Sequence, residues 1–182
     1  MLDRQIRFGL SLPWSPLENL VAQAEIAEKA GFRSLWYPDH IITPGPDVIL
    51  ESFITLTVLA GKTKNCMLGP MVVDPYRRHP STLAHSTLTL DNVSNGRAFL
   101  GIGAGEPMNL APIGIKLEHP LRYLRESIQL IKGLYGATKE NPFNFNGKVF
   151  KAEKASIGLS SVQKPAPPVY VGALGPKTRQ VT

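Results

Sequence analysis

Four polar residues in two stretches of the sequence have side chains suited to proton transfer and to holding a heterocyclic ring. Asp39 and His40 place a carboxylate beside an imidazole, which can gain or lose a proton near neutral pH. Glu106 and Asn109 follow a glycine-rich stretch. A carboxyl in such a pocket can act as an acid or base, and an amide offers a ring edge both a donor and an acceptor. Each pair could instead be a polar group that caps or orders its own loop.

The glycine-rich stretch LGIGAGEPMN, residues 100–109, fails as a dinucleotide-binding loop. The nucleotide fingerprint G-x-G-x-x-G, counted from Gly101 and Gly103, requires a third glycine at position 106. The residue there is Glu106, whose carboxylate would repel a pyrophosphate. These glycines therefore need another explanation.

Composition and residue spacing exclude several other classes of function. The chain has 182 residues, 43% of them hydrophobic, and a net charge of +6. No basic run is longer than Arg77-Arg78, so the net charge fits a solvated basic surface, or attraction for an anionic cofactor, better than a nucleic-acid binder. No metal-ligand spacing, P-loop or G-x-S-x-G motif is present, so we predict no metal site.

The single cysteine, Cys66, has no disulfide partner in the chain, and no signal peptide follows Met1. No apolar run approaches the ~20 residues that span a bilayer. We therefore predict a cytoplasmic protein with neither a membrane nor a nucleic-acid partner. Of the remaining histidines, we expect His79 to cap a helix, and His85 and His119 to be structural.

The elements that position these residues alternate between strand and helix. Continuous apolar runs predict strands buried on both faces, as in a parallel sheet covered by helices. Strands are expected at residues 6–12, 34–37, 67–73, 98–102 and 169–171. Helices are expected from residue 16 to about 31, at 48–60, at 80–93 and from residue 120. The last of these carries Leu121, Leu124, Ile128 and Ile131 in helical register. The first helix should begin with a capping box, in which Ser15 is the N-cap and Glu18 reaches back.

The alternation is interrupted at about residues 141–160, where Asn146-Gly147 predicts a hairpin turn between two short strands. The chain thus has four strand–helix units, an inserted hairpin and one further strand. A five-stranded doubly wound sheet would fit the length, but residues 11–14 lack the phosphate fingerprint expected at its first turn. We therefore predict that residues 1–182 form the N-terminal portion of a single α/β domain, a (β/α)8 TIM barrel that needs its missing half or a partner.

In a barrel, the carboxyl ends of the strands form the mouth of the active site. The polar stretches described above all follow predicted strands, although they are far apart in the sequence. The barrel hypothesis therefore predicts that they converge on one site. The predicted strand ends are Trp14, residues 39–40, 71–74, 103–109 and 172–176.

Four motifs together resemble the luciferase-like superfamily of flavin-dependent oxidoreductases, and in particular its branch that uses the deazaflavin coenzyme F420, typified by methylenetetrahydromethanopterin reductase. The order and spacing of the motifs carry the resemblance, which covers essentially the whole chain. The motifs are AEKAGFRSLWYPDH (27–40), LGPMVVDPYRRHPSTLA (68–84), TLDNVSNGRAFLGIGAGEPMN (89–109) and VYVGALGP (169–176).

The resemblance implies a barrel with an insertion before strand five, a flavin-like ring at the mouth, and hydride transfer to or from that ring. It implies that His40, the usual acid/base candidate, and Glu106 are catalytic. The implied cofactor-binding residues are Asp39 beside the ring, Met71 and Val72 in a strand-three bulge with a non-prolyl cis peptide, Asn109 at the ring edge, and the phosphate-approaching loop of Gly172, Ala173, Leu174 and Gly175. The glycines at 101–105 would let the backbone pass close under the ring.

The expected function is therefore that of an F420-dependent oxidoreductase, which transfers hydride between the deazaflavin and a small organic or pterin-type substrate. An FMN-dependent luciferase-like monooxygenase is one alternative, because it would share the fold. A non-catalytic half-barrel or partner subunit is another, motivated by the end of the chain at Thr182. We expect a homo-oligomer (a dimer), or a partner that supplies the missing half of the barrel.

Overall fold

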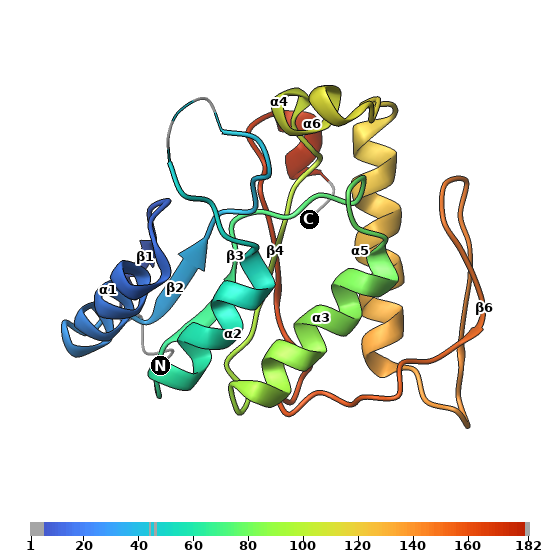
Figure 1. Cartoon of the computed structure of the whole chain (residues 1–182). Coiled ribbons are helices and arrows are strands. Elements are labelled where there is room, and N and C mark those ends of the chain that lie inside the picture. Colours follow the sequence, from blue (N-terminus) through green and yellow to red (C-terminus); the bar gives the residue numbers. More distant parts are fainter. Residues whose placement is uncertain (1–5, 44, 46, 181–182) are drawn as a thin grey trace.

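The computed structural model describes residues 6–43, 45 and 47–180, which form an α/β fold around a parallel sheet (Figure 1). Three strands pair in the order β1-β2-β3, and β4 pairs with β7. Isolated bridges from Leu68 to Ala98 and from Val73 to Ile102 join β3 to β4. The strands are β1 (Gly9–Ser11), β2 (Ser34–Tyr37), β3 (Met67–Pro70), β4 (Leu100–Ile102) and β7 (Val169–Val171). All of these pairings are parallel, as predicted.

Four long helices lie on the same side of this sheet in Figure 1: α1 (Leu17–Lys29), α2 (Ser52–Lys62), α3 (Pro80–Val93) and α5 (Pro120–Gly136). Of the four residues in the predicted apolar register of α5, Leu124, Ile128 and Ile131 are buried in the core, and Leu121 is half-buried. The short helices α4 (Pro107–Leu110) and α6 (Pro176–Arg179) and the 3-10 turn Ala111–Ile113 follow β4 and β7. In Figure 1, α4 and α6 lie together at the top, beyond the carboxyl ends of the strands.

The described strands form part of a barrel and no closed ring, since β1 and β7 are the outer strands and no pairing joins them. The first strand is shorter than predicted, and Ile6 and Phe8 ahead of it are 81% and 67% exposed. An outer strand with one neighbour has little to bury these side chains. No helix of the described residues is long and apolar enough to cross a membrane.

The predicted helix starts were partly wrong. The helix α1 begins at Leu17, with Pro16 at the N-cap position and no side-chain cap, so the capping box of Ser15 and Glu18 does not form. The helix α2 begins only at Ser52, because Glu51 accepts a hydrogen bond from the backbone N–H of Ile54 and caps it there. The prediction for His79 is confirmed, since its imidazole caps α3.

The predicted insertion is an antiparallel hairpin of β5 (Phe143–Asn146) and β6 (Lys151–Ala155), which stands beside α5 (Figure 1). The predicted hairpin is thus present, and its connection, residues 147–150, begins at Gly147. A side chain of α5 binds the backbone of this connection through hydrogen bonds. The carboxylate of Glu126 on α5 accepts hydrogen bonds from the backbone N–H groups of Lys148, Val149 and Phe150.

The Glu126 carboxylate is stabilised in its charged form. Burial alone would raise its pKa, but the three backbone donors and the charge of Arg122 outweigh burial and lower the pKa from its ordinary value of 4.5. A lowered pKa in the folded chain adds stability above pH 4.5. That stability is lost as the pH falls through the lower value of the folded state.

We predict that Glu126→Gln lowers the free energy of unfolding by about 2 kcal/mol at neutral pH, the value of a hydrogen bond to a charged group. The variant should also lose part of the acid-dependent destabilisation that the parent shows below pH 4.5. Urea unfolding followed by circular dichroism at several pH values measures both effects. Glu153→Gln, the same change at an exposed position of β6, is the matched control and should change little. Equal stability of the two variants would contradict the proposed anchor.

Candidate active site

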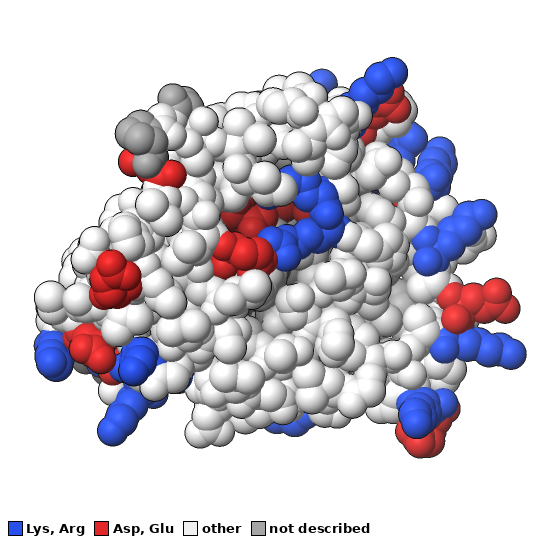
Figure 2. All heavy atoms as spheres, in the orientation of Figure 1, with Lys and Arg blue, Asp and Glu red and all other residues white. Residues whose placement is uncertain are grey.

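A cavity of about 400 Å³ lies at the carboxyl ends of the strands, and all ten of the predicted site residues line it. They come from the segments that follow β2, β3, β4 and β7, so the predicted convergence is confirmed as geometry. Figure 2 shows that acidic and basic side chains also meet in a hollow on the helix-covered face. The ten residues are Asp39, His40, Met71, Val72, Glu106, Asn109, Gly172, Ala173, Leu174 and Gly175.

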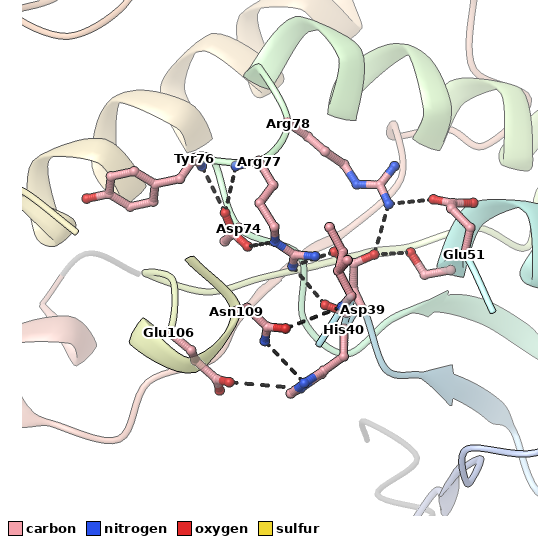
Figure 3. A network of polar contacts seen from close by, with 11 residues as sticks. Asp39, His40, Glu51, Asp74, Tyr76, Arg77, Arg78, Glu106 and Asn109 are labelled. Atoms are coloured by element: carbon pink, nitrogen blue, oxygen red, sulfur yellow. Dashed lines mark hydrogen bonds and ion pairs between the residues drawn. The ribbon is translucent and has the colours of Figure 1, made fainter. Parts of the chain in front are cut away.

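His40 faces two side chains that follow β4, those of Glu106 and Asn109 (Figure 3). Its Nδ1 atom is 3.1 Å from the amide nitrogen of Asn109, and its Nε2 atom is 3.9 Å from a carboxylate oxygen of Glu106. The indole of Trp14, beyond β1, contacts the imidazole with ring centroids 5.2 Å apart. His40 is 19% exposed and Glu106 58% exposed, so the carboxylate is the more accessible of the pair.

Asp39 points away from His40 into a buried charge network (Figure 3). Its carboxylate accepts hydrogen bonds from Arg77, Arg78 and the hydroxyl of Ser52. Asp39 is only 4% exposed, and both of its carboxylate oxygens have partners in the protein. Asp39 therefore lines the cavity with its charge balanced by Arg77 and Arg78. Its predicted role in binding a cofactor stays a prediction.

Arg77 connects this network to the end of β3. One Nη of Arg77 contacts the carbonyl and carboxylate of Asp39, and its Nε donates to Asp74. The other carboxylate oxygen of Asp74 accepts the backbone N–H groups of Tyr76 and Arg77 itself. No role was predicted for Arg77, whose side chain is only 6% exposed.

Arg78 bridges Asp39 to Glu51, the residue that caps α2. Burial alone would lower the pKa of the Arg78 guanidinium, but the charges and hydrogen bonds of Asp39 and Glu51 outweigh it and raise the pKa. The guanidinium also lies over the ring of Phe53, at 5.5 Å from the centroid. Sequence reasoning missed both arginines as parts of the site; only the spacing Asp74-x-x-Arg77 hinted at a local ion pair.

The cis peptide implied between Met71 and Val72 is present. Three glycines surround the Val72 side chain. A Cβ atom on Gly103 would lie 2.7 Å from one Val72 methyl group, and one on Gly172 would lie 3.3 Å from both. At Gly101 a Cβ would clash with the carbonyl of Pro70. Gly101 and Gly103 therefore make room for the β3 bulge and for Val72.

Among the described residues, no group of three or more His, Cys, Asp or Glu side chains is placed to hold a metal ion. The polar groups that line the cavity include the imidazole of His40, the carboxylate of Glu106 and the amide of Asn109. Exposed apolar side chains complete the lining, since Met71 is 40% and Leu174 98% exposed. The cavity thus combines groups that can transfer protons, His40 and Glu106, with apolar side chains that can pack against a flat ligand.

The family model for luciferase-like monooxygenases matches residues 5–182 of this chain. The chain belongs to the luciferase-like monooxygenase family. It is 35% identical to the 5,10-methylenetetrahydromethanopterin reductase of Archaeoglobus fulgidus, over 97% of this chain and 50% of that protein. It is 33% identical to the F420-dependent hydroxymycolic acid dehydrogenase of Mycobacterium tuberculosis, over 88% of this chain and 45% of the relative.

Solved structures of luciferase-like family members have the same fold. An F420-dependent secondary alcohol dehydrogenase, in complex with an F420–acetone adduct, matches 97% of this chain and 54% of that one, with a TM-score of 0.85 and 25% identity. The F420-dependent tetrahydromethanopterin reductase of Methanopyrus kandleri matches with a TM-score of 0.82 and 27% identity, over 97% and 53%. The chain spans about half the length of the relatives it matches. Its open sheet is therefore part of the family's TIM barrel.

We predict that Gly101→Ala lowers the free energy of unfolding by about 1–3 kcal/mol, because the new methyl group overpacks β4 against Pro70 and Val72. Denaturant unfolding measures the change. Gly61→Ala is the matched control, since Gly61 lies in α2 with open space where a Cβ would be. That variant should be stabilised by about 0.5–1 kcal/mol, the gain for replacing a helical glycine. A tolerated Gly101→Ala would contradict the tight packing of these strands.

Proposed function

We propose that this chain carries the cofactor-binding and proton-transfer part of an F420-dependent oxidoreductase, which transfers hydride between the deazaflavin and a small organic or pterin-type substrate. The observation that carries the proposal is one cavity. It is lined by the His40–Glu106 pair, the Met71-Val72 bulge and the loop 172–175. The chain also resembles F420-dependent reductases and dehydrogenases at 33–35% identity.

The cavity fits a flat heterocycle with one polar and one apolar side. Its volume of about 400 Å³ falls in the range of small-molecule sites. Met71 and Leu174 are exposed there without apolar partners that would cover them fully, and a ring stacked against them would remove that surface from water. When bound, the deazaflavin supplies the carbon that gives or accepts the hydride.

The polar side chains have distinct proposed roles. His40 and Glu106 hold or move the proton that accompanies hydride transfer, because their facing atoms are only 3.9 Å apart at the cavity. Asn109 orders His40 and completes the ring edge. Asp39, fixed by two arginines, forms a rigid wall behind them. The loop 172–175 lines the same cavity and would approach a cofactor phosphate, as the resemblance implies. The backbone N–H of Gly172 already donates to the carbonyl of Ile102, so the phosphate would meet the residues after it.

Further strands are proposed to cover the opposite end of the sheet in the active form. A hollow of about 800 Å³ lies there, lined in part by Ile6, Phe8 and the 46%-exposed Tyr170. Apolar side chains on an unpaired sheet edge favour association. The covering strands would come from the rest of a longer protein, from a second copy of the chain, or from a partner subunit.

We predict that the chain binds F420 at least tenfold more tightly than FMN, because the proposed site is that of a deazaflavin enzyme. Quenching of cofactor fluorescence during titration measures both affinities, and sedimentation in the same samples gives the mass of the binding species. Ala173→Trp fills the cavity and should abolish binding, whereas Ala166→Trp, in a separate hollow, should not. Tighter binding of FMN, or equal binding by both variants, would refute the proposal.

We further predict that His40→Ala and Glu106→Gln each lower the rate of hydride transfer by about 10²-fold or more, the usual contribution of a general acid or base. Stopped-flow absorbance of the cofactor in the active assembly measures this step. His85→Ala is the matched control, because His85 is exposed on α3 away from the cavity. Turnover near the parent rate in either site variant would remove that residue from the proposed mechanism.

A further inference from the structure

The amide of Asn109 is fixed at both ends by residues that follow β2. Its oxygen accepts a hydrogen bond from the backbone N–H of Ile41 at 3.3 Å, and its nitrogen faces Nδ1 of His40 at 3.1 Å (Figure 3). Asn109 itself is only 3% exposed. Both of its polar atoms therefore have partners in the protein.

The contact with Ile41 decides which way the amide points. A backbone N–H can only donate, so the amide oxygen must face Ile41, and the amide NH2 group must face His40. An NH2 group can only donate as well. The hydrogen bond to His40 therefore requires a lone pair on Nδ1, and the neutral imidazole must carry its proton on Nε2.

The other groups around His40 agree with this assignment. Nε2 faces the cavity and lies 3.9 Å from a carboxylate oxygen of Glu106. A charged carboxylate can accept a hydrogen bond from an N–H group, but it has no proton to donate to a lone pair. The remaining neighbouring charge, Asp39, has its carboxylate bound by Arg77 and Arg78. Trp14 contacts the imidazole through its ring.

We propose that Asn109 is a positioning residue that holds His40 as the neutral Nε2–H tautomer. His40 then meets its ligand as a hydrogen-bond donor, suited to a carbonyl or alkoxide oxygen at the hydride-exchanging carbon. With the amide held by Ile41, its NH2 group offers no acceptor to an N–H on Nδ1 of His40. The catalytic consequence rests on the proposed function, whereas the tautomer itself does not.

The tautomer can be measured on the cofactor-free chain by ¹⁵N NMR with labelled histidine. The spectrum distinguishes a protonated ring nitrogen from an unprotonated one, and a His40→Ala sample identifies the His40 signals among the four histidines. At a pH where the ring is neutral, we expect an unprotonated Nδ1 and a protonated Nε2. A protonated Nδ1 in the parent would overturn the proposal.

Two variants separate Asn109 from Glu106 as the cause. Asn109→Asp places carboxylate oxygens toward both Ile41 and His40, so the predominant tautomer should change from Nε2–H to Nδ1–H. Glu106→Gln leaves the Nδ1 side untouched and should keep the parent tautomer. An unchanged tautomer in Asn109→Asp, or a reversal in Glu106→Gln, would overturn the proposal. If Asn109→Asp fails to fold, the parent and Glu106→Gln spectra still decide. A failure to bind F420 would contradict the proposed function and leave these spectra unaffected.

Discussion

The guanidinium of Arg77 joins the carboxyl ends of two neighbouring strands, and the geometry of the site depends on that contact. It bonds to Asp39 beyond β2 and to Asp74 beyond β3, with all three side chains nearly inaccessible to water. Removing one partner of such a pair leaves an uncompensated buried charge, at a cost of about 3–5 kcal/mol. His40 directly follows Asp39 in the chain, so the ion pair that fixes Asp39 also fixes the point from which His40 enters the cavity.

A second constraint comes from close backbone packing at the same strand ends. The bulge after β3 carries Val72 over Gly101, Gly103 and Gly172, where little room remains for side chains. These glycines belong to segments that are distant in the sequence but adjacent across β4 and β7. The cavity floor is therefore shaped by packing between strands, and the charge network of Asp39 and Arg77 holds the adjacent wall.

Local patterns in the sequence predicted the strand–helix order, the apolar face of α5 and the insertion. Buried strands and helices place apolar residues at regular spacings, and the hairpin is signalled by its own turn residues. The convergence of the polar segments on one site could also be predicted, because a parallel sheet brings the carboxyl ends of its strands to one edge. The sequence could not reveal contacts made across long separations. The burial of Arg77 depends on Asp39, and the hairpin turn depends on Glu126 of α5. The capping box failed because Pro16 itself occupies the N-cap position.

The contacts of His40 explain why part of a barrel can already hold a defined proton site. Its ring neighbours are Trp14, Glu106 and Asn109, and its backbone neighbour Asp39 is fixed by Arg77 and Arg78. All of these residues precede the hairpin, and the first four strands position them. The loop 172–175 adds a wall from β7 that contributes no side-chain charge. In the proposed function, proton transfer would therefore depend on groups that the first four strands position, whereas ligand binding would also use the loop after the fifth strand.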